Sequence, residues 1–410
     1  MKKLLLVLLI LSLFINHLNA NEKDLQIIQK DKKEYRLLDK ESIQTRQQSQ
    51  KYDWISPIDL SGNIGRNHSF SDENSRNLNN KNTKSASIGF TQSIFESGGI
   101  GFKMDYADNR FKYEMLSWEN QNSQLIYTIY NTLLDIKKLK LEINQNDYRI
   151  VNKDIELIIK KIQYEAGKTD IIELNNAIMS KNLILKEEIA LKNSLKEKEQ
   201  ELAKYTDLKY DEIEILDFQE TNKEIFLDKN YSILEADAKV EMLNSEYKIK
   251  KSQYLPKLSL SAKASYSNQD EKFNSMISDT NKDDASSSGS LILSMPLYDY
   301  TKSSKVQESK IEVLKQKALV NDLKNETAFE YEQIFTKIDT YLKQNETINK
   351  NIKLYEELIG ANQISSEAGM TSKYDLEILG NTKTINEFDI LINKINILQQ
   401  YAKLYFKIKN

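Results

Sequence analysis

The chain has 410 residues, no cysteine, two histidines and a formal net charge of −3. Without cysteine there is no disulfide framework, no thiolate metal site and no lipid attachment at an N-terminal cysteine, and a charge so close to neutral does not indicate a nucleic-acid partner. His17 lies in a segment that we expect to be removed, and His68 lies in a polar segment where we expect a solvated loop. A histidine zinc site or a histidine general base is therefore not expected.

Residues 1–20 are interpreted as a secretory signal peptide. Lys2 and Lys3 precede an apolar run from Leu4 to Phe14, and a polar segment then ends at Ala20. Removing this segment takes away two lysines and no acid, so the net charge of the mature chain becomes −5. The apolar run is too short to span a membrane, and no later segment approaches the roughly 20 apolar residues of a transmembrane helix. If the chain crosses a bilayer, it must do so with strands.

Residues 21–50 are highly charged and carry apolar residues at helical spacing, which predicts an amphipathic helix; a solvated N-terminal extension is the alternative. The period then changes to two, because Leu60 and Ile64, and later Ile88 and Phe90, alternate with polar residues. Residues 69–84 between these runs have the Asn, Ser, Asp, Lys and Arg composition of an exposed loop. We predict a β-hairpin over residues 54–97.

Residues 102–166 contain no glycine and no proline and are predicted to form one long helix, about 95 Å in length at 1.5 Å per residue. Gly167 is the first residue suited to a left-handed helix end, and a shorter helix is predicted over residues 170–204. Apolar and aromatic residues of the long helix recur every seven positions, the spacing of a coiled-coil seam, at Ile129, Ile136, Ile143, Ile150, Leu157 and Tyr164.

The same order returns in the second half of the chain. The turn Glu165-Ala166-Gly167-Lys168-Thr169 recurs 202 residues later as Glu367-Ala368-Gly369-Met370-Thr371. Residues 21–205 and 227–410 are therefore interpreted as two copies of one structural repeat, joined by a connecting segment at 206–226. In the second repeat we predict a helix over about 227–251, a β-hairpin over 255–298 with a polar loop at 268–289, a long helix over 301–368 interrupted only by Gly360, and a last helix over 373–407.

The three prolines are predicted to mark helix–strand junctions. Pro57 and Pro256 stand at the start of the two hairpins, and Pro296 stands at the end of the second. Proline lacks the N–H group that a helix or a strand ladder uses, so these positions are typical ends of elements.

The two hairpins supply four strands, which are too few to close a barrel within one chain. Their edges must then be closed by other chains. One strand face is Leu, Ala, Ile, Phe and Tyr and the other is Ser, Lys, Asp and Asn, which is typical of strands between lipid and water. A soluble antiparallel sheet with one wet face is the alternative. Aromatic residues at the strand ends suit a membrane interface: Trp54, Phe95, Tyr254 and Tyr298.

Two segments beside the strands carry a resemblance to a known family. They are Tyr254-Leu255-Pro256-Lys257-Leu258-Ser259-Leu260 and Leu293-Ser294-Met295-Pro296-Leu297-Tyr298. Together with the repeated Glu-Ala-Gly-x-Thr turn and the duplicated order of elements, they resemble the TolC-type outer-membrane efflux channel family, the outer membrane factors, over essentially all of the mature chain.

The resemblance implies a mainly α fold with β structure. Its parts are a duplicated long-helix α-barrel in the periplasm, with residues 206–226 as the equatorial segment, and a four-stranded contribution per chain to a trimeric transmembrane β-barrel. The implied location is the outer membrane of a Gram-negative bacterium, with most of the chain in the periplasm. The implied partners are two further copies of the chain, outer-membrane lipid, a periplasmic adaptor protein and an inner-membrane transporter of the RND, ABC or MFS type. No cofactor, metal or catalytic residue is implied.

In that family, acidic residues shortly after the helix turns line the periplasmic entrance. Carboxylates repeated by threefold symmetry would form rings that favour cations and hold divalent ions, and ordinary solvated helix positions are the alternative. The matching positions are Glu173 and Asp375, with Glu377 nearby, and Tyr164 keeps an aromatic side chain before the first turn. The resemblance also places adaptor contacts at the helix-turn tips, around Gly167, Thr169, Gly369 and Thr371.

These expectations define a passive function. The chain is predicted to be the exit duct of a tripartite efflux pump or of a type I secretion system, carrying drugs, toxic compounds or polypeptides, and it is not expected to be an enzyme. Because it lacks a phosphate-binding glycine loop, energy coupling is expected to come from its partners. A periplasmic coiled-coil scaffold or adaptor without a pore is the alternative. An adaptor should show a single helical hairpin and Gly/Pro-rich β domains, whereas this chain is duplicated and has only three prolines.

Overall fold

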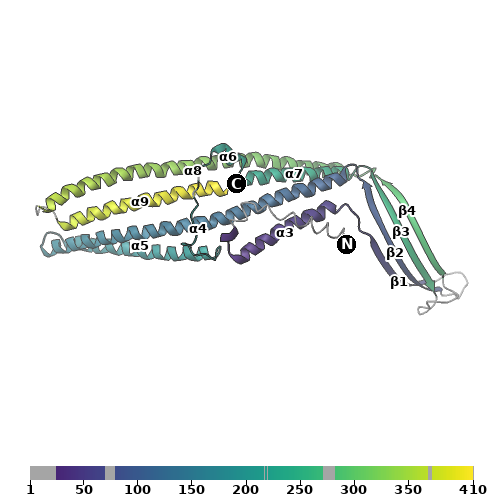
Figure 1. Cartoon of the computed structure of the whole chain (residues 1–410), viewed down its shortest axis with the longest axis horizontal. Helices are drawn as coiled ribbons and strands as arrows, with labels where there is room; N and C mark the ends of the chain where they lie inside the picture. Colours follow the sequence, from purple (N-terminus) through teal and green to yellow (C-terminus); the bar gives the residue numbers. More distant parts are fainter. Residues whose placement is uncertain are drawn as a thin grey trace, which may run out of the picture. The chain divides into compact units, whose positions relative to one another are not determined.

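The structure is a computed structural model and describes residues 25–69, 79–216, 218, 220–270, 282–367 and 372–409. The signal peptide predicted at residues 1–20 lies outside these ranges. In chain order the elements are η2 (Leu25–Ile27), α3 (Lys30–Tyr52), β1 (Asp59–Ser69), β2 (Asn79–Phe95), α4 (Gly99–Glu165), α5 (Ile171–Ala203), α6 (Lys223–Asp228), α7 (Tyr231–Ser252), β3 (Lys257–Asp270), β4 (Lys282–Ser294), α8 (Lys302–Glu367) and α9 (Lys373–Phe406) (Figure 1).

The chain divides into two compact units. Helices α3, α4, α7 and α8 contribute residues to both units, and each unit draws on both halves of the chain. The sequence repeat and the compact units are therefore different divisions of the same chain. The helical unit combines Met1–Lys40, Leu116–Glu235 and Asn321–Asn410, and the sheet unit combines Glu41–Met115 and Ala236–Val320.

Helix α4 begins three residues before the predicted start. Ser97 and Gly98 have φ values of 52° and 89°, and the amide of Gly99 donates to the carbonyl oxygen of Glu96 over 2.9 Å. Glycine adopts positive φ without a steric penalty, so this turn directs the chain into the helix at Gly99. Helix α8 continues through Gly360 without a break.

The apolar seam predicted for α4 is buried along only part of that helix. On α4, Ile129 and Ile136 are fully buried, whereas Tyr164 near the end of the helix is 42% exposed. On α8, Val320 and Ile334 are buried. Between the apolar part of α4 and its end, buried side chains include the polar residues Gln145, Asn146 and Asn152. None of the described helices carries an apolar stretch long enough for a membrane span.

Apolar packing in the helical unit includes a cluster that joins α6, α8 and the C-terminal residues. Tyr331, Phe335, Ile397 and Tyr401 pack around its edge. This cluster holds the short helix α6 against two long ones, although six residues alone would not form a stable helix. Its buried members are Phe226, Ile334, Ile338, Leu404 and Ile408.

The helix predicted over residues 227–251 is interrupted. Helix α6 ends at Asp228 and α7 begins at Tyr231, and between them Asn230 pairs with Ile408 as an isolated antiparallel bridge. The side chain of Asn230 also accepts a hydrogen bond from the amide of Ser232 over 3.0 Å and thereby caps α7. Contact with the C-terminal residues, together with this cap, accounts for the break.

Glu330 on α8 joins α9 and the residue that follows it through two ion pairs. Its carboxylate oxygens lie 2.8 Å from Nζ of Lys403 and 2.5 Å from Nζ of Lys407. Burial by itself would raise the pKa of Glu330, but the hydrogen bonds and charges of the two lysines outweigh burial and hold the pKa below its ordinary value of 4.5.

Because its pKa is lowered, Glu330 is predicted to contribute to the loss of folding stability at acid pH. The stability that Glu330 contributes is complete above its unfolded pKa of about 4.5 and is lost as the pH falls through the lower folded pKa. Between about pH 6 and about pH 3, we expect the free energy of unfolding to fall less in Glu330→Gln than in the unmodified protein. Urea unfolding at both pH values measures this difference, and an equal fall in the two proteins would assign the acid sensitivity to other carboxylates.

The sheet unit contains one antiparallel sheet in the order β1-β2-β3-β4, in which the pairing of β2 with β3 joins the two hairpins. The strands extend into both predicted loops, since residues 79–84 belong to β2 and residues 282–289 belong to β4. Ladder hydrogen bonds use backbone groups alone, so a polar sequence continues a strand once a neighbour is aligned. His68 likewise lies in β1, opposite Asn80, and the prediction of a loop at that position was wrong.

Candidate functional site

The turn between α4 and α5 is closed by a glycine in the left-handed conformation. Gly167 has a φ of 69°, which agrees with the conformation predicted for it. Its amide donates to the carbonyl oxygen of Tyr164 over 3.0 Å, and the amide of Lys168 donates to the carbonyl oxygen of Gln163 over 2.8 Å. This pair of bonds is a Schellman motif, which satisfies carbonyl groups left open at the end of a helix.

Gly167→Ala is expected to destabilise the turn by about 1 kcal/mol, because a Cβ at positive φ crowds the following carbonyl oxygen. No neighbouring atom lies within 4 Å of the added Cβ, so backbone strain is the cause. Gly360→Ala is the matched control. Its added Cβ likewise has no neighbouring atom within 4 Å, but because this glycine lies in a helix, alanine should raise the stability by about 0.5–1 kcal/mol. Amide hydrogen exchange reports both effects, and unchanged protection at Gly167 and Lys168 in the first variant would contradict the prediction.

Two of the four residues predicted at the helix-turn tips are described. Gly167 and Thr169 lie in the α4–α5 turn, where Thr169 is half-buried. Gly369 and Thr371 lie outside the described residues. Tyr164, predicted to lie beside the entrance, is an exposed residue in the last turn of α4.

The two acids predicted for the entrance occupy the same position in their helices. Glu173 is the third residue of α5, and its amide donates to the N-cap Asp170 over 2.9 Å. Asp375 is the third residue of α9, which begins after the N-cap Ser372. An acid in the first turn of a helix is stabilised by the helix dipole. Both acids therefore have a local structural role in addition to any role in a pore.

The charges around these acids differ. Nζ of Lys160 lies 2.9 Å from Oε2 of Glu173, so the charge of Glu173 is compensated by the same chain. Asp375 and Glu377 are exposed and have no ion-pair partner within the described ranges. Among the described residues, no group of three or more His, Asp or Glu side chains could hold a metal ion.

The three prolines lie in the connections between helices and strands. Pro57 lies between α3 and β1, Pro256 between α7 and β3, and Pro296 between β4 and α8. The carbonyl oxygen of Pro256 accepts a hydrogen bond from the hydroxyl group of Ser97 over 2.7 Å. Through this bond the start of the second hairpin is tied to the end of the first.

One face of the sheet is apolar and exposed. The register aligns Leu60 with Ile88 and Ile88 with Ala264 across three strands. Leu60, Leu291 and Leu293 are 79%, 67% and 73% exposed. No described part of the chain covers these side chains, and in water a continuous apolar face of this kind marks a surface that contacts lipid or another protein.

The opposite face is lined by hydroxyl groups. The row next to Leu60 consists of a serine on each strand, paired in register: Ser61, Ser87, Ser265 and Ser286. The hydroxyl groups of Ser61 and Ser87 are 2.8 Å apart, and those of Ser265 and Ser286 are 2.9 Å apart. The two faces of the sheet therefore suit lipid on one side and water on the other, as predicted from the alternation.

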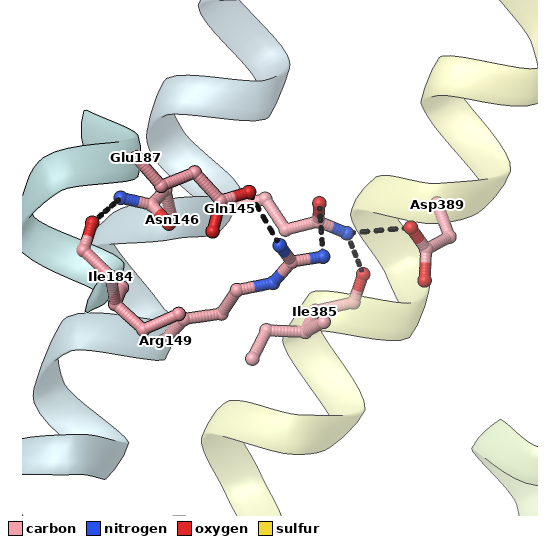
Figure 2. Close-up of polar contacts among 7 residues, drawn as sticks. All are labelled: Gln145, Asn146, Arg149, Ile184, Glu187, Ile385 and Asp389. Carbon is pink, nitrogen blue, oxygen red and sulfur yellow. Dashed lines mark hydrogen bonds and ion pairs between the residues drawn. The ribbon is translucent and has the colours of Figure 1, made fainter. Parts of the chain in front are cut away.

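Figure 2 shows a polar network that ties α4 to both shorter helices. Gln145 on α4 donates to the carbonyl oxygen of Ile385 over 2.9 Å and to Asp389 over 2.7 Å, both on α9. The side-chain oxygen of Gln145 accepts a hydrogen bond from Arg149 over 3.2 Å, and Arg149 also donates to Glu187 on α5 over 3.4 Å. One buried amide thus connects three helices.

The polar network was not predicted from the sequence. The side chain of Asn146 donates to the carbonyl oxygen of Ile184 on α5 over 3.3 Å, and the buried Asn152 accepts a hydrogen bond from Asn381 on α9 over 2.9 Å. Polar residues in a helix seam favour one register over others. The sequence signal that could have indicated this network is Asn146. It stands three residues after Ile143, at a position where a coiled-coil seam usually carries an apolar residue.

The comparisons with known proteins agree on one fold. Residues 224–378 match the model of the outer membrane efflux protein family. The outer membrane protein VceC of Vibrio cholerae is 12% identical, with a TM-score of 0.71 over 93% of this chain and 94% of that one. The CmeC outer membrane channel of Campylobacter jejuni is 12% identical, with a TM-score of 0.70 over 93% and 86% of the two chains. No curated protein sequence matches the chain.

A third solved structure, the open state of the MtrE outer membrane channel of Neisseria gonorrhoeae, is also 12% identical, with a TM-score of 0.67 over 94% of this chain and 88% of that one. At these identities the structural likeness establishes the fold, and the predicted fold class of long helices with a four-stranded contribution is confirmed. The matched family model is that of outer membrane efflux proteins, and the three solved structures are outer-membrane proteins or channels, in agreement with the predicted location and channel function. The chain therefore has the fold of the TolC-type outer-membrane efflux channels, and its residues 224–378 match the outer membrane efflux protein family.

Proposed function

We propose that three copies of the chain form a duct through the outer membrane and across the periplasm, and that this duct is the exit of a tripartite efflux pump or a type I secretion system. A periplasmic adaptor and an inner-membrane transporter supply the coupling to energy. The substrates are drugs, toxic compounds or secreted polypeptides.

The observation that carries this proposal is the sheet, with its apolar face, its hydroxyl face and its two open edges. Strands β1 and β4 stand at the ends of the strand order and pair on one side only within the described residues. Each open edge presents unpaired backbone groups, which in a membrane must be satisfied by another strand. Three copies joined β4 to β1 satisfy every edge and close the strands into one barrel.

A periplasmic scaffold or adaptor without a pore is the alternative function. It has no use for a sheet whose leucines are 67–79% exposed on one face. A scaffold would have to cover that face with a protein partner, whereas a channel places it against lipid.

The test begins with the mature protein purified from the outer-membrane fraction. We expect trimers that resist heat in detergent and discrete conductance steps in planar lipid bilayers. A protein that stays monomeric and dissolves without detergent would refute the channel. Deleting the gene and comparing drug sensitivity with secreted polypeptides then separates a drug pump from a secretion system.

The periplasmic entrance is proposed to lie at the helix-turn tips, with Tyr164, Glu173, Asp375 and Glu377 around it. The turn of Gly167 and Thr169, in which Gly167 is exposed, presents small side chains suited to close helix approach by an adaptor. Gly369 and Thr371 are proposed to form the second adaptor contact because the sequence repeat makes them the equivalents of that turn.

The ion pair of Glu173 leads to a specific prediction for ion selectivity. Because Lys160 compensates Glu173, the pair carries no net charge, so the double variant Lys160→Gln/Glu173→Gln should leave the cation preference of the channel nearly unchanged, whereas Asp375→Asn should lower it. Lys160→Gln should raise it, since it leaves three uncompensated carboxylates in the trimer. A unit charge a few Å from a passing ion in water contributes about 1 kcal/mol, or about a fivefold change in preference. Reversal potentials in a salt gradient measure the effect, and an equal loss in Asp375→Asn and in the double variant Lys160→Gln/Glu173→Gln would exclude compensation by Lys160.

A further inference from the structure

The connection between β4 and α8 exposes large apolar and aromatic side chains. Leu297, Tyr298 and Tyr300 are 92%, 84% and 86% exposed. Leu297 comes three residues after the end of β4 at Ser294, next to the exposed Leu293 of the apolar face. Side chains of this size are rarely left fully in water next to an apolar face, which indicates that something covers them.

The equivalent connection in the first repeat is closed by contacts within the chain. The hydroxyl group of Ser97 donates to the carbonyl oxygen of Pro256 over 2.7 Å, and the carboxylate of Glu96 lies 3.1 Å from Nζ of Lys103. Both junctions have carboxylates with partners within the chain, but the second leaves larger areas exposed, 84–92% for Leu297, Tyr298 and Tyr300 against 53% for Phe95 at the first.

Beside the exposed aromatics lies a groove of about 490 Å³ with two lysines in its wall. Its lining includes Lys251, Leu255, Tyr300 and Lys302, together with Asp299. The carboxylate of Asp299 is occupied by the start of α8, since it accepts hydrogen bonds from the amide and the hydroxyl group of Thr301 over 2.8 and 2.7 Å.

The two lysines are available to an anion. Lys251 is exposed and has no ion-pair partner within the described residues. Lys302 lies over the ring of Tyr254 at 5.3 Å from its centre, a contact that leaves its ammonium hydrogens free for an anion. The groove thus combines two cationic heads with apolar and aromatic walls, at the end of a face that suits lipid.

We propose that this groove binds the phosphate headgroup of an anionic phospholipid in the leaflet that borders the helices. The inference rests on the proposed outer-membrane function. The phosphate lies between Lys251 and Lys302, the rings of Tyr298 and Tyr300 lie at the headgroup level where amphipathic aromatics are favoured, and an acyl chain runs along Leu297 and the apolar face. The site anchors the channel at a defined depth.

The experiment is native mass spectrometry of the detergent-solubilised trimer, titrated with phosphatidylglycerol and with zwitterionic phosphatidylcholine. We expect phosphatidylglycerol to bind more tightly. A lysine near a lipid surface contributes about fivefold in affinity, so Lys251→Gln/Lys302→Gln should weaken phosphatidylglycerol binding about 30-fold and leave phosphatidylcholine unchanged. Lys310→Gln/Lys317→Gln removes the same charge from exposed positions of α8 outside the groove and should have no effect.

An unchanged affinity for phosphatidylglycerol in Lys251→Gln/Lys302→Gln, or an equal loss in the control, would overturn the proposal. Tyr300→Ser tests whether a second copy covers the groove instead. Weaker lipid binding with unchanged heat resistance of the trimer supports the lipid site, whereas lower heat resistance with unchanged lipid binding assigns the groove to the subunit contact. If the trimers conduct ions but do not prefer phosphatidylglycerol, the lipid site is refuted and the proposed channel function still holds. If the protein forms no trimers and conducts no ions, the proposed channel function is refuted.

Discussion

Leu60→Arg is expected to prevent assembly of the channel in the outer membrane, while Ser61→Arg is tolerated. Leu60 is 79% exposed on the apolar face and lies two rows from Lys84, where that face turns polar. Ser61 is its neighbour on the hydroxyl face. An arginine on the lipid face of a barrel costs up to about 2–4 kcal/mol per copy at the bilayer midplane, or up to about 6–12 kcal/mol per trimer. An arginine on the water-filled side costs little.

The same substitution separates a lipid-facing sheet from a water-facing one. If the apolar face lay in water, replacing a leucine that is 79% exposed would change the free energy of unfolding by no more than about 0.5 kcal/mol. The measurement is the amount of heat-resistant trimer in outer-membrane fractions of cells that produce each variant at equal levels. Equal trimer yields for Leu60→Arg and Ser61→Arg would show that the apolar face does not contact lipid.

Phe226→Ala is expected to lower the free energy of unfolding by about 3–5 kcal/mol. Phe226 is fully buried in α6, and its ring lies 5.5 Å from that of Tyr331, measured between centres. The cluster around it also holds Leu404 and Ile408. Losing the ring leaves a cavity in the packing that attaches α6 to the long helices, so the loss should also expose the backbone of α6.

Phe226→Leu serves as the control because it keeps most of the buried volume and should cost less than about 1.5 kcal/mol. Urea unfolding of the detergent-solubilised protein, followed by circular dichroism, measures both variants, and amide hydrogen exchange locates the change. If Phe226→Ala costs less than about 1 kcal/mol, the cluster repacks around the lost ring, and the connecting segment does not depend on Phe226 for its attachment.

Local chemistry was enough to predict the main elements. The lack of glycine and proline over residues 102–166 leaves no reason for that helix to end, and Gly167 supplies the left-handed residue that its C-terminus needs. Alternation with period two identified the centres of the strands. It did not identify their ends, because residues 282–289 are held in β4 by backbone bonds to β3 and not by their side chains.

The candidate site also combines features that the sequence predicted with features that it did not. The positions of Glu173 and Asp375 in the repeat were readable from the sequence, but the lysine that compensates one of them was not, because Lys160 and Glu173 meet only when α4 and α5 fold back on each other. The network of Gln145 and Arg149 was hidden for the same reason, since its partners are up to 244 residues away in the chain.

The sequence by itself determined the helices, the strand centres, the duplicated order and the resemblance to a family, because each depends on local conformational preference or on a short motif. Only the tertiary structure decided the pairing of β2 with β3, the break between α6 and α7, the partners of the buried polar side chains and the difference between the two strand–helix junctions. These features depend on contacts between distant residues, and neither composition nor periodicity records which distant residues will meet.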